Sequence, residues 1–252
     1  MKIGAQLYNL REYCKTTADL EETIKKVADM GFTNLQLSGV CAYDPEWMRD
    51  TLNKYGITCS LTHFSFDRIK NEPETVMKEH LTYGCKYIGI GGRNNLLTDN
   101  DLNDVIGVAK TSGKIFAEGG CRFMYHNHHG ELNKDENGVT RLDALLNATT
   151  PDELGITIDT YWLQHAGCDV ADWIKKLKGR IPCVHFKDMK VNGLEVRMAP
   201  VGSGNINFEK LIPLCAESGA EYIIIEQDNS YGEDPFEELR KGYKHLRSLG
   251  LE

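Results

Sequence analysis

The sequence lacks the long apolar runs that mark membrane-spanning and exported proteins. No run approaches the roughly 20 apolar residues that a membrane-spanning helix needs. The opening stretch, MKIGAQLYNLREYC, also lacks the extended apolar segment of a secretory signal peptide. We therefore expect a cytoplasmic protein with no membrane partner.

Closely spaced cysteine pairs are absent as well. The chain has eight cysteines, none of them in a CxxC pattern, and several stand within apolar strand or helix patterns. This distribution favours reduced, buried thiols over a disulfide framework or a zinc ribbon. The cysteines are Cys14, Cys41, Cys59, Cys85, Cys121, Cys168, Cys183 and Cys215.

Positive charge is scarce. The chain has 29 Lys and Arg residues against 37 Asp and Glu residues, and its formal net charge is −8. A surface of this balance disfavours binding to polyanions, although a local basic site is compatible with it. We therefore expect no nucleic-acid partner.

Short apolar runs alternate eight times with segments of helical periodicity. The expected strands cover residues 2–8, 34–39, 57–65, 87–92, 122–128, 154–162, 181–189 and 222–228, and the expected helices cover residues 19–31, 44–56, 72–84, 101–120, 139–148, 170–179, 207–219 and 234–250. Parallel strands need helical crossovers, and eight of them can close a sheet. The pattern predicts an α/β fold, a (β/α)8 TIM barrel that forms a single domain over residues 1–252.

An open, doubly wound sheet is the alternative fold. Against it, no GxGxxG or GxxxxGK[ST] motif follows the first strand, so the usual nucleotide-binding fingerprints are missing. The stretch GIGGRNN after the fourth strand is weak evidence for phosphate binding, because a tight strand-to-helix loop explains it equally well.

Ionisable and polar side chains gather at the expected strand ends. In a barrel these ends converge on one face, where enzymes of this fold place their chemistry. Buried charge is costly unless it is compensated, and a divalent cation would compensate several carboxylates and imidazoles at once. The residues are Gln6, His63, His126, His128, Glu131, Asp159, His185, Lys187, Glu226 and Asp228.

Structural explanations compete with this one. One of the two carboxylates that end apolar strands, Asp159 and Glu226, could be a helix N-cap. His185 could be a core histidine bonded to a carbonyl, and Lys187 could simply pair with a neighbouring acid. His165 has the sequence context of a packing residue. Several strands each end in a residue of a type that binds metals, and this favours metal binding for Asp159, His185 and Glu226.

The motifs together resemble those of the sugar phosphate isomerase/epimerase group of the xylose isomerase-like barrel superfamily. The resemblance covers essentially the whole chain and rests on the order and spacing of several motifs. They are GAQLYNLRE, YHNHHGE, DTYWLQHAG, VHFKD followed by PVGSGNINF, and IIIEQD.

The resemblance implies one divalent metal ion, most often Mn²⁺, with Mg²⁺, Co²⁺ and Zn²⁺ as alternatives. Its expected ligands are Glu131, Asp159, His185 and Glu226. Many relatives have a glutamate at the end of the fifth strand, where this chain has His126, so the choice between His126 and Glu131 stays open. We expect Glu131.

The implied activity is that of a sugar isomerase or epimerase. Such an enzyme removes a proton next to a carbonyl and forms a metal-stabilised enediolate. The same site could serve a dehydratase or lyase acting on a keto-sugar, keto-glycoside or keto-inositol. A metal-dependent endonuclease at abasic sites is less favoured, because it predicts more ligands and a basic groove. A non-catalytic sugar-binding barrel would leave the gathered ionisable residues unexplained.

Roles for individual residues follow from this chemistry as expectations. Glu226 is the expected base, Glu131 or His128 the second proton carrier, and Lys187 the group that polarises the carbonyl. A small carbohydrate would be bound by Gln6, His63, His126, Trp162, His165 and Arg197. The resemblance also implies a homodimer or homotetramer.

Overall fold

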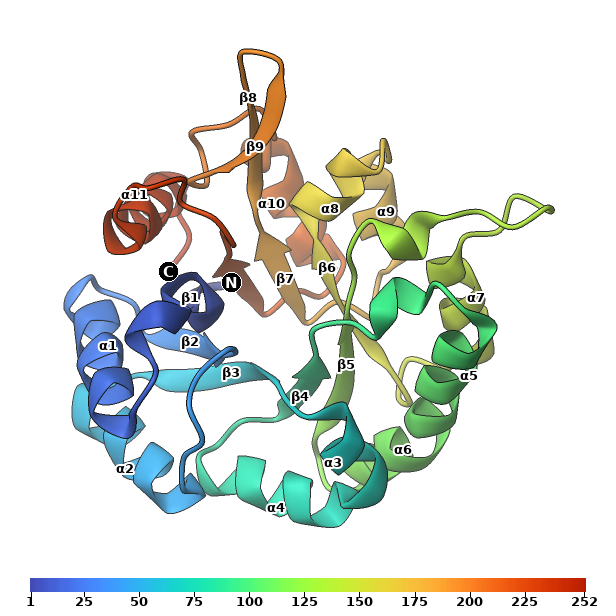
Figure 1. The fold of residues 1–252 in the computed structure, drawn as a ribbon, viewed down its shortest axis with the longest axis horizontal. Coiled ribbons are helices and arrows are strands. Elements are labelled where there is room, and N and C mark those ends of the chain that lie inside the picture. The colour runs from blue at the N-terminus through green and yellow to red at the C-terminus, as the bar shows by residue number, and fades with distance from the viewer.

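Eight parallel strands close into a barrel in the computed structural model, which describes residues 1–252 (Figure 1). Neighbouring strands follow the order β1-β10-β7-β6-β5-β4-β3-β2, and β1 pairs with both β10 and β2, which closes the sheet. This confirms the TIM barrel and the single-domain architecture. The barrel strands are β1 (Lys2–Gln6), β2 (Asn34–Leu37), β3 (Thr58–His63), β4 (Tyr87–Ile90), β5 (Arg122–His126), β6 (Gly155–Asp159), β7 (Cys183–Phe186) and β10 (Tyr222–Ile225).

Helices surround the barrel, as Figure 1 shows. Local signals set their ends: Thr16 and Asp19 form a reciprocal cap at the start of α1, and Gly56 ends α2 in a left-handed conformation. The helices are α1 (Thr17–Asp29), α2 (Pro45–Tyr55), α3 (Phe66–Asn71), α4 (Pro73–Thr82), α5 (Asp99–Val108), α6 (Lys114–Glu118), α7 (Arg141–Ala148), α8 (Thr160–His165), α9 (Val170–Lys176), α10 (Phe208–Glu217) and α11 (Pro235–Ser248). Short 3-10 turns, η1 (Leu7–Tyr13), η2 (Asn94–Leu96) and η4 (Gly130–Leu132), lie in the connecting loops.

Several segments differ from the expected pattern, and helix α3 is one that was not expected. The expected helix over 101–120 is interrupted by a π-helical turn, η3 (Ala109–Gly113). The strand expected to run to residue 162 ends at Asp159, because the Asp159 side chain accepts a hydrogen bond from the Trp162 amide and starts α8. An antiparallel hairpin, β8 (Asp188–Asn192) with β9 (Glu195–Ala199), was not expected and projects from the barrel (Figure 1).

Two apolar layers lie on opposite faces of the sheet. Side chains alternate between the faces of a strand, so Phe123 and Tyr125 of β5 join the main core under the helices, whereas Met124 points into the barrel. The main core contains 55 buried residues, which makes the sheet–helix interface the principal source of stability. The cluster inside the barrel consists of Leu61, Tyr87, Met124, Cys183 and Ile224.

All eight cysteines are free, and only Cys41 and Cys168 are partly accessible. None of the helices has the length and apolar character that crossing a membrane requires.

Candidate metal centre and active site

The strands deliver four side chains of the types that ligate metals to one point at the C-terminal end of the barrel. Because inward-facing positions recur every second residue, His126 follows Met124 into the barrel, His185 follows Cys183 and Glu226 follows Ile224. Asp159 joins them from the end of β6. One ligand atom of each residue lies within 4.8 Å of those of the others, and all four residues are buried.

Direct contacts link the four residues. The Nδ1 atom of His185 lies 2.9 Å from Oε2 of Glu226. The Nε2 atom of His126 lies 3.3 Å from Oδ2 of Asp159 and 3.7 Å from Oε2 of Glu226. The four ligands therefore face a common centre.

A glutamine fixes one of the imidazoles. Oε1 of Gln36, on β2, lies 2.7 Å from Nε2 of His185 and can accept the proton of that nitrogen. His185 thus has an oxygen against each ring nitrogen. A metal-bound histidine commonly donates its other ring N–H to an oxygen in this way.

The charge balance also fits a divalent cation. Lys187 is the cation in contact with the carboxylates: its Nζ lies 2.6 Å from Asp228, 3.5 Å from Glu226 and 3.7 Å from Asp159. Three carboxylates against one ammonium leave negative charge at a site where water is scarce. Two imidazoles and two carboxylates are a donor set that suits Zn²⁺, Mn²⁺ and related ions.

Two of the four residues have the protonation state that metal binding requires. Burial lowers the pKa of His126 well below its ordinary value, with a further contribution from His185, so His126 is neutral. Burial acts to raise the pKa of Glu226, but Lys187 and then His185 outweigh it, and the pKa lies well below the ordinary value. A metal ion binds the neutral imidazole and the ionised carboxylate. At Asp159 burial raises the pKa well above its ordinary value, and a bound cation would lower it.

Glu131 does not join the cluster, contrary to the expectation that it would be the ligand from strand five. Its Oε1 accepts a hydrogen bond from the Tyr125 hydroxyl at 2.8 Å, and its Oε2 accepts one from the His128 amide at 3.0 Å. Tyr125 faces the helices because it alternates with His126. Glu131 is therefore held behind the strand, and His126 occupies the strand-end position beside Asp159.

A pocket of about 230 Å³ lies above the cluster. Glu226 and His126 of the cluster face this pocket, which a substrate would enter. His63 and His128, which were expected at the site, also line it. Its lining residues are Tyr8, Ser38, His63, Gly91, His126, His128, Glu226 and Asp228.

Gln6 and Trp162 do not line the pocket. Gln6 is buried at the end of β1, where its side chain accepts a hydrogen bond from the Tyr8 amide. The Trp162 ring lies 4.8 Å from Nζ of Lys187, and its Nε1 is buried without a partner.

His165 and Arg197 lie farther out. His165 stacks on Tyr161, with ring centroids 5.5 Å apart. Arg197, on β9, pairs with Glu195 and lies over the Tyr231 ring. Neither residue lines the pocket above the cluster, so the structure does not bring them to the centre.

The fold and the cluster agree with what comparison with known proteins finds. The profile of the xylose isomerase-like TIM barrel family matches residues 24–249. The chain belongs to this family. At the level of the fold, the expected resemblance to sugar phosphate isomerases and epimerases is confirmed: a protein of that name from Parabacteroides distasonis superimposes with a TM-score of 0.82 at 19% identity, covering 98% of this chain and 93% of that one.

Sequence relatives point to enzymes. An inosose dehydratase of Geobacillus kaustophilus is 24% identical over 70% of this chain and 64% of its own length, slightly under two thirds. An inosose dehydratase of Mesomycoplasma hyopneumoniae is 23% identical over 91% of this chain and 88% of its own length. Family membership together with these relatives identifies the chain as an enzyme.

Gln36 and Ser38 were missed in the sequence. Both are buried, Gln36 contacts His185, and Ser38 lines the pocket. The signal was the alternation Asn34, Gln36, Ser38, which places polar groups on one face of a short strand.

Proposed function

We propose that the chain is a metal-dependent dehydratase that removes water from a keto-polyol, such as an inosose. The observation that carries this proposal is the buried cluster of His126, Asp159, His185 and Glu226 beneath a small polar pocket. The name shared by the sequence relatives supports elimination ahead of isomerisation. Both reactions begin with loss of a proton next to a carbonyl.

The four clustered residues would hold one divalent ion, for which Mn²⁺ is the first candidate and Zn²⁺, Mg²⁺ and Co²⁺ are alternatives. When bound, such an ion polarises the substrate carbonyl and makes the neighbouring C–H more acidic. Gln36 orients His185 for this role, and His126 takes the place that Glu131 was expected to fill.

His128 is the residue that we assign to proton transfer. It lines the pocket, and its side chain is 26% exposed. Burial, reinforced by Lys187, lowers its pKa to about 4, so the imidazole is neutral and can accept a proton near pH 7. We therefore assign the base to His128 in preference to Glu226, whose Oε2 is already engaged by His185 and lies 3.5 Å from Lys187.

The elimination conserves both protons and electrons. His128 takes the proton from the carbon next to the carbonyl, the C–H electron pair forms the new double bond, and the C–O bond at the adjacent carbon breaks. The imidazolium returns its proton to the departing hydroxyl, which leaves as water.

Lys187 would hold an oxygen of the substrate rather than move a proton. Burial acts to lower its pKa, but Glu226, Asp159 and Asp228 together raise it above its ordinary value. The ammonium therefore stays charged throughout the neutral range and serves as a hydrogen-bond donor.

Isomerisation or epimerisation is the second candidate, because the structural similarity to a sugar phosphate isomerase/epimerase supports it. In that case His128 would return the proton to carbon. The endonuclease alternative has less support, since the structure has one cluster of four potential ligands and the net charge is −8.

Turnover in heavy water tests the proposal. Manganese-loaded protein is mixed with an inosose, and products are followed by mass spectrometry and NMR. Dehydration predicts a product lighter by one water, and His128→Asn should slow it on the order of 10²-fold while metal content is unchanged. A product of unchanged formula that carries deuterium next to the carbonyl would assign an isomerase or epimerase instead. No reaction with any keto-polyol would reject the proposal.

A further inference from the structure

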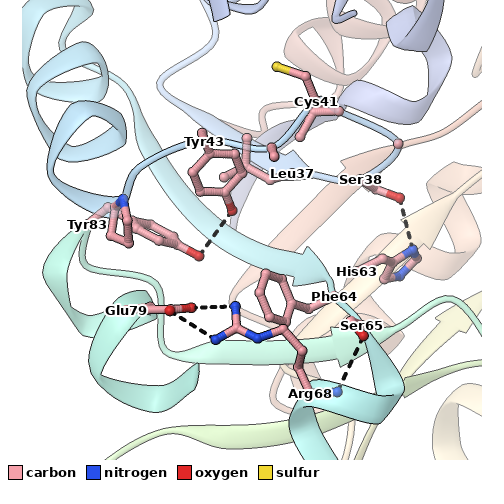
Figure 2. Close-up of a pocket in the computed structure, with 14 residues that line it drawn as sticks. Leu37, Ser38, Cys41, Tyr43, His63, Phe64, Ser65, Arg68, Glu79 and Tyr83 are labelled. Atoms are coloured by element: carbon pink, nitrogen blue, oxygen red, sulfur yellow. Dashed lines mark hydrogen bonds and ion pairs between the residues drawn. The ribbon is translucent and has the colours of Figure 1, made fainter. Parts of the chain in front are cut away.

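A second hollow opens beside the active-site pocket, between the ends of β2 and β3 and the helices α2 and α4. It measures about 270 Å³ and is called the side pocket below. Ser38 and His63 line both hollows, so the two adjoin at these side chains. Figure 2 shows the hydrogen bond between Ser38 and His63 at one end of the side pocket, with the aromatic residues at the other.

Aromatic rings form much of the wall. Tyr43 and Tyr83 meet edge to face with centroids 5.9 Å apart, and Phe64 lines the pocket from the end of β3 (Figure 2). Such rings bind the flat face of another ring with little loss of side-chain entropy. The side pocket is therefore shaped for a ring rather than for a flexible chain.

The two tyrosines also offer one unused donor. Their hydroxyl oxygens lie 3.3 Å apart, so one hydroxyl donates to the other. The hydrogen of the accepting hydroxyl has no acceptor of its own in the protein. Burial holds the pKa of both groups above its ordinary value, so both hydroxyls stay neutral. They can bind an oxygen of an uncharged ligand.

The charged residues of the side pocket neutralise each other. Arg68 donates two hydrogen bonds of 3.0 Å to the carboxylate of Glu79, as Figure 2 shows, and a third of 3.1 Å to Glu72. A phosphate or carboxylate would have to displace Glu79 from this two-point contact. The side pocket therefore disfavours an anionic group.

Size supports a ligand that spans both hollows. Pockets for drug-sized ligands measure roughly 300–1,000 Å³. Each hollow alone is smaller, at about 230 and 270 Å³, whereas the two joined fall within that range.

We infer that the side pocket binds a second, uncharged ring of the substrate, so that the preferred substrate is a ring-substituted keto-polyol. This inference rests on the proposed function, because the polyol part must sit above the metal-binding cluster. Ser38 and His63 then flank the bond that joins the two rings. The side pocket determines specificity and takes no part in the bond-breaking step.

Binding of unreactive polyols tests the inference without requiring turnover. Inositol, its monophenyl ether, its monogalactoside and its monophosphate are titrated by calorimetry into manganese-loaded protein. We expect one of the two neutral ring-bearing ligands to bind at least about tenfold more tightly than inositol, and the monophosphate to gain nothing. The phenyl and galactosyl ligands distinguish an aromatic ring from a sugar ring.

Ala42 supplies the matched variants, because it lines the side pocket, is exposed, and belongs to neither the cluster nor the main core. Ala42→Trp should fill the side pocket and abolish the advantage of the ring-bearing ligand, while inositol binding changes less than about twofold. Ala42→Ser should change neither. Tyr43→Phe, which removes only a hydroxyl, should weaken binding of the galactosyl ligand by about three- to tenfold.

The outcomes separate the two proposals. If a ring gives no advantage, if the monophosphate binds best, or if Ala42→Trp weakens both ligands equally, the side-pocket inference is wrong whatever the activity. If the ring advantage and its loss in Ala42→Trp are observed but no keto-polyol is dehydrated, the inference holds for binding and the proposed reaction fails.

Discussion

The upper and lower halves of the barrel interior come from the same strands but have opposite chemistry. Met124, Cys183 and Ile224 pack with Leu61 and Tyr87 into an apolar cluster. Two residues further along the same strands stand His126, His185 and Glu226. Strand alternation sends both sets inward, so backbone geometry alone does not distinguish them. The difference shows that one layer of the barrel interior serves stability and the next serves the site.

The upper layer, which contains His126, His185 and Glu226, buries polar atoms without hydrogen-bond partners, and this lowers the stability of the fold. Buried polar atoms without a partner include Nε2 of Gln6, Gln36 and His63 and Nδ1 of His126. Each unpaired buried group costs about 1–3 kcal/mol. Such a concentration of unsatisfied groups is tolerated where a ligand completes their contacts, and all four residues lie at the C-terminal end of the strands.

The largest effect is expected from Asp159→Ala in the upper layer. Loss of one of two anionic ligands should remove the divalent ion and lower activity on the order of 10²–10³-fold. Elemental analysis and the heavy-water assay measure both. Because Asp159 also caps α8, circular dichroism must show an intact fold. If the variant keeps its metal and its activity, the upper layer does not hold the metal as proposed.

Strand five allows a sharper test within the upper layer. His126→Ala should weaken metal binding on the order of 10²-fold or more, because it removes a ligand. Glu131→Gln should weaken it by less than about tenfold, because Glu131 bonds Tyr125 and the His128 amide. Both variants are titrated with Mn²⁺ by calorimetry. The reverse ranking would return the ligand role to Glu131.

Leu61→Ala in the lower layer should act on stability alone. Leu61 is fully buried, and truncating such a leucine costs about 2–5 kcal/mol of the free energy of unfolding. Metal stoichiometry should be unchanged. The control is Leu97→Ala, since Leu97 is 57% exposed and its truncation should change the free energy by less than about 0.5 kcal/mol. Loss of metal from folded Leu61→Ala would show that the two layers are coupled.

The smallest effect concerns a histidine outside the barrel. His80 on α4 donates from Nδ1 to the Val76 carbonyl at 2.7 Å, and its Nε2 accepts from the Thr62 hydroxyl at 3.0 Å. Burial lowers its pKa from 6.5 to about 4. The unfolded chain therefore binds this proton more readily, and the stabilisation present above pH 6.5 is lost as the pH falls toward 4.

The loss attributable to His80 should amount to roughly 3 kcal/mol at most. Urea unfolding of the wild type and of His80→Gln between pH 7 and pH 4 measures it, and the variant should have the flatter profile. Parallel profiles would mean that His80 does not contribute to the pH dependence of stability.

Sequence patterns could predict the barrel because each strand–helix unit repeats a local signal. They could not predict the hairpin of β8 and β9, whose outer part exposes the apolar side chains of Val191, Leu194 and Val196. They also could not place Arg197 or His165, because the loops after the strands are positioned by contacts with distant residues such as Tyr231.

The sequence by itself determined the fold and three members of the cluster, because the periodicity of apolar residues is local and the C-terminal strand ends of a barrel must converge. Only the tertiary structure shows that the fourth member is His126 and not Glu131. Adjacent residues of a strand point to opposite faces, so Tyr125 draws Glu131 toward the helices while His126 faces Asp159. The same holds for Gln36, whose contact with His185 joins residues 149 positions apart, and for the side pocket, whose walls come from separate elements.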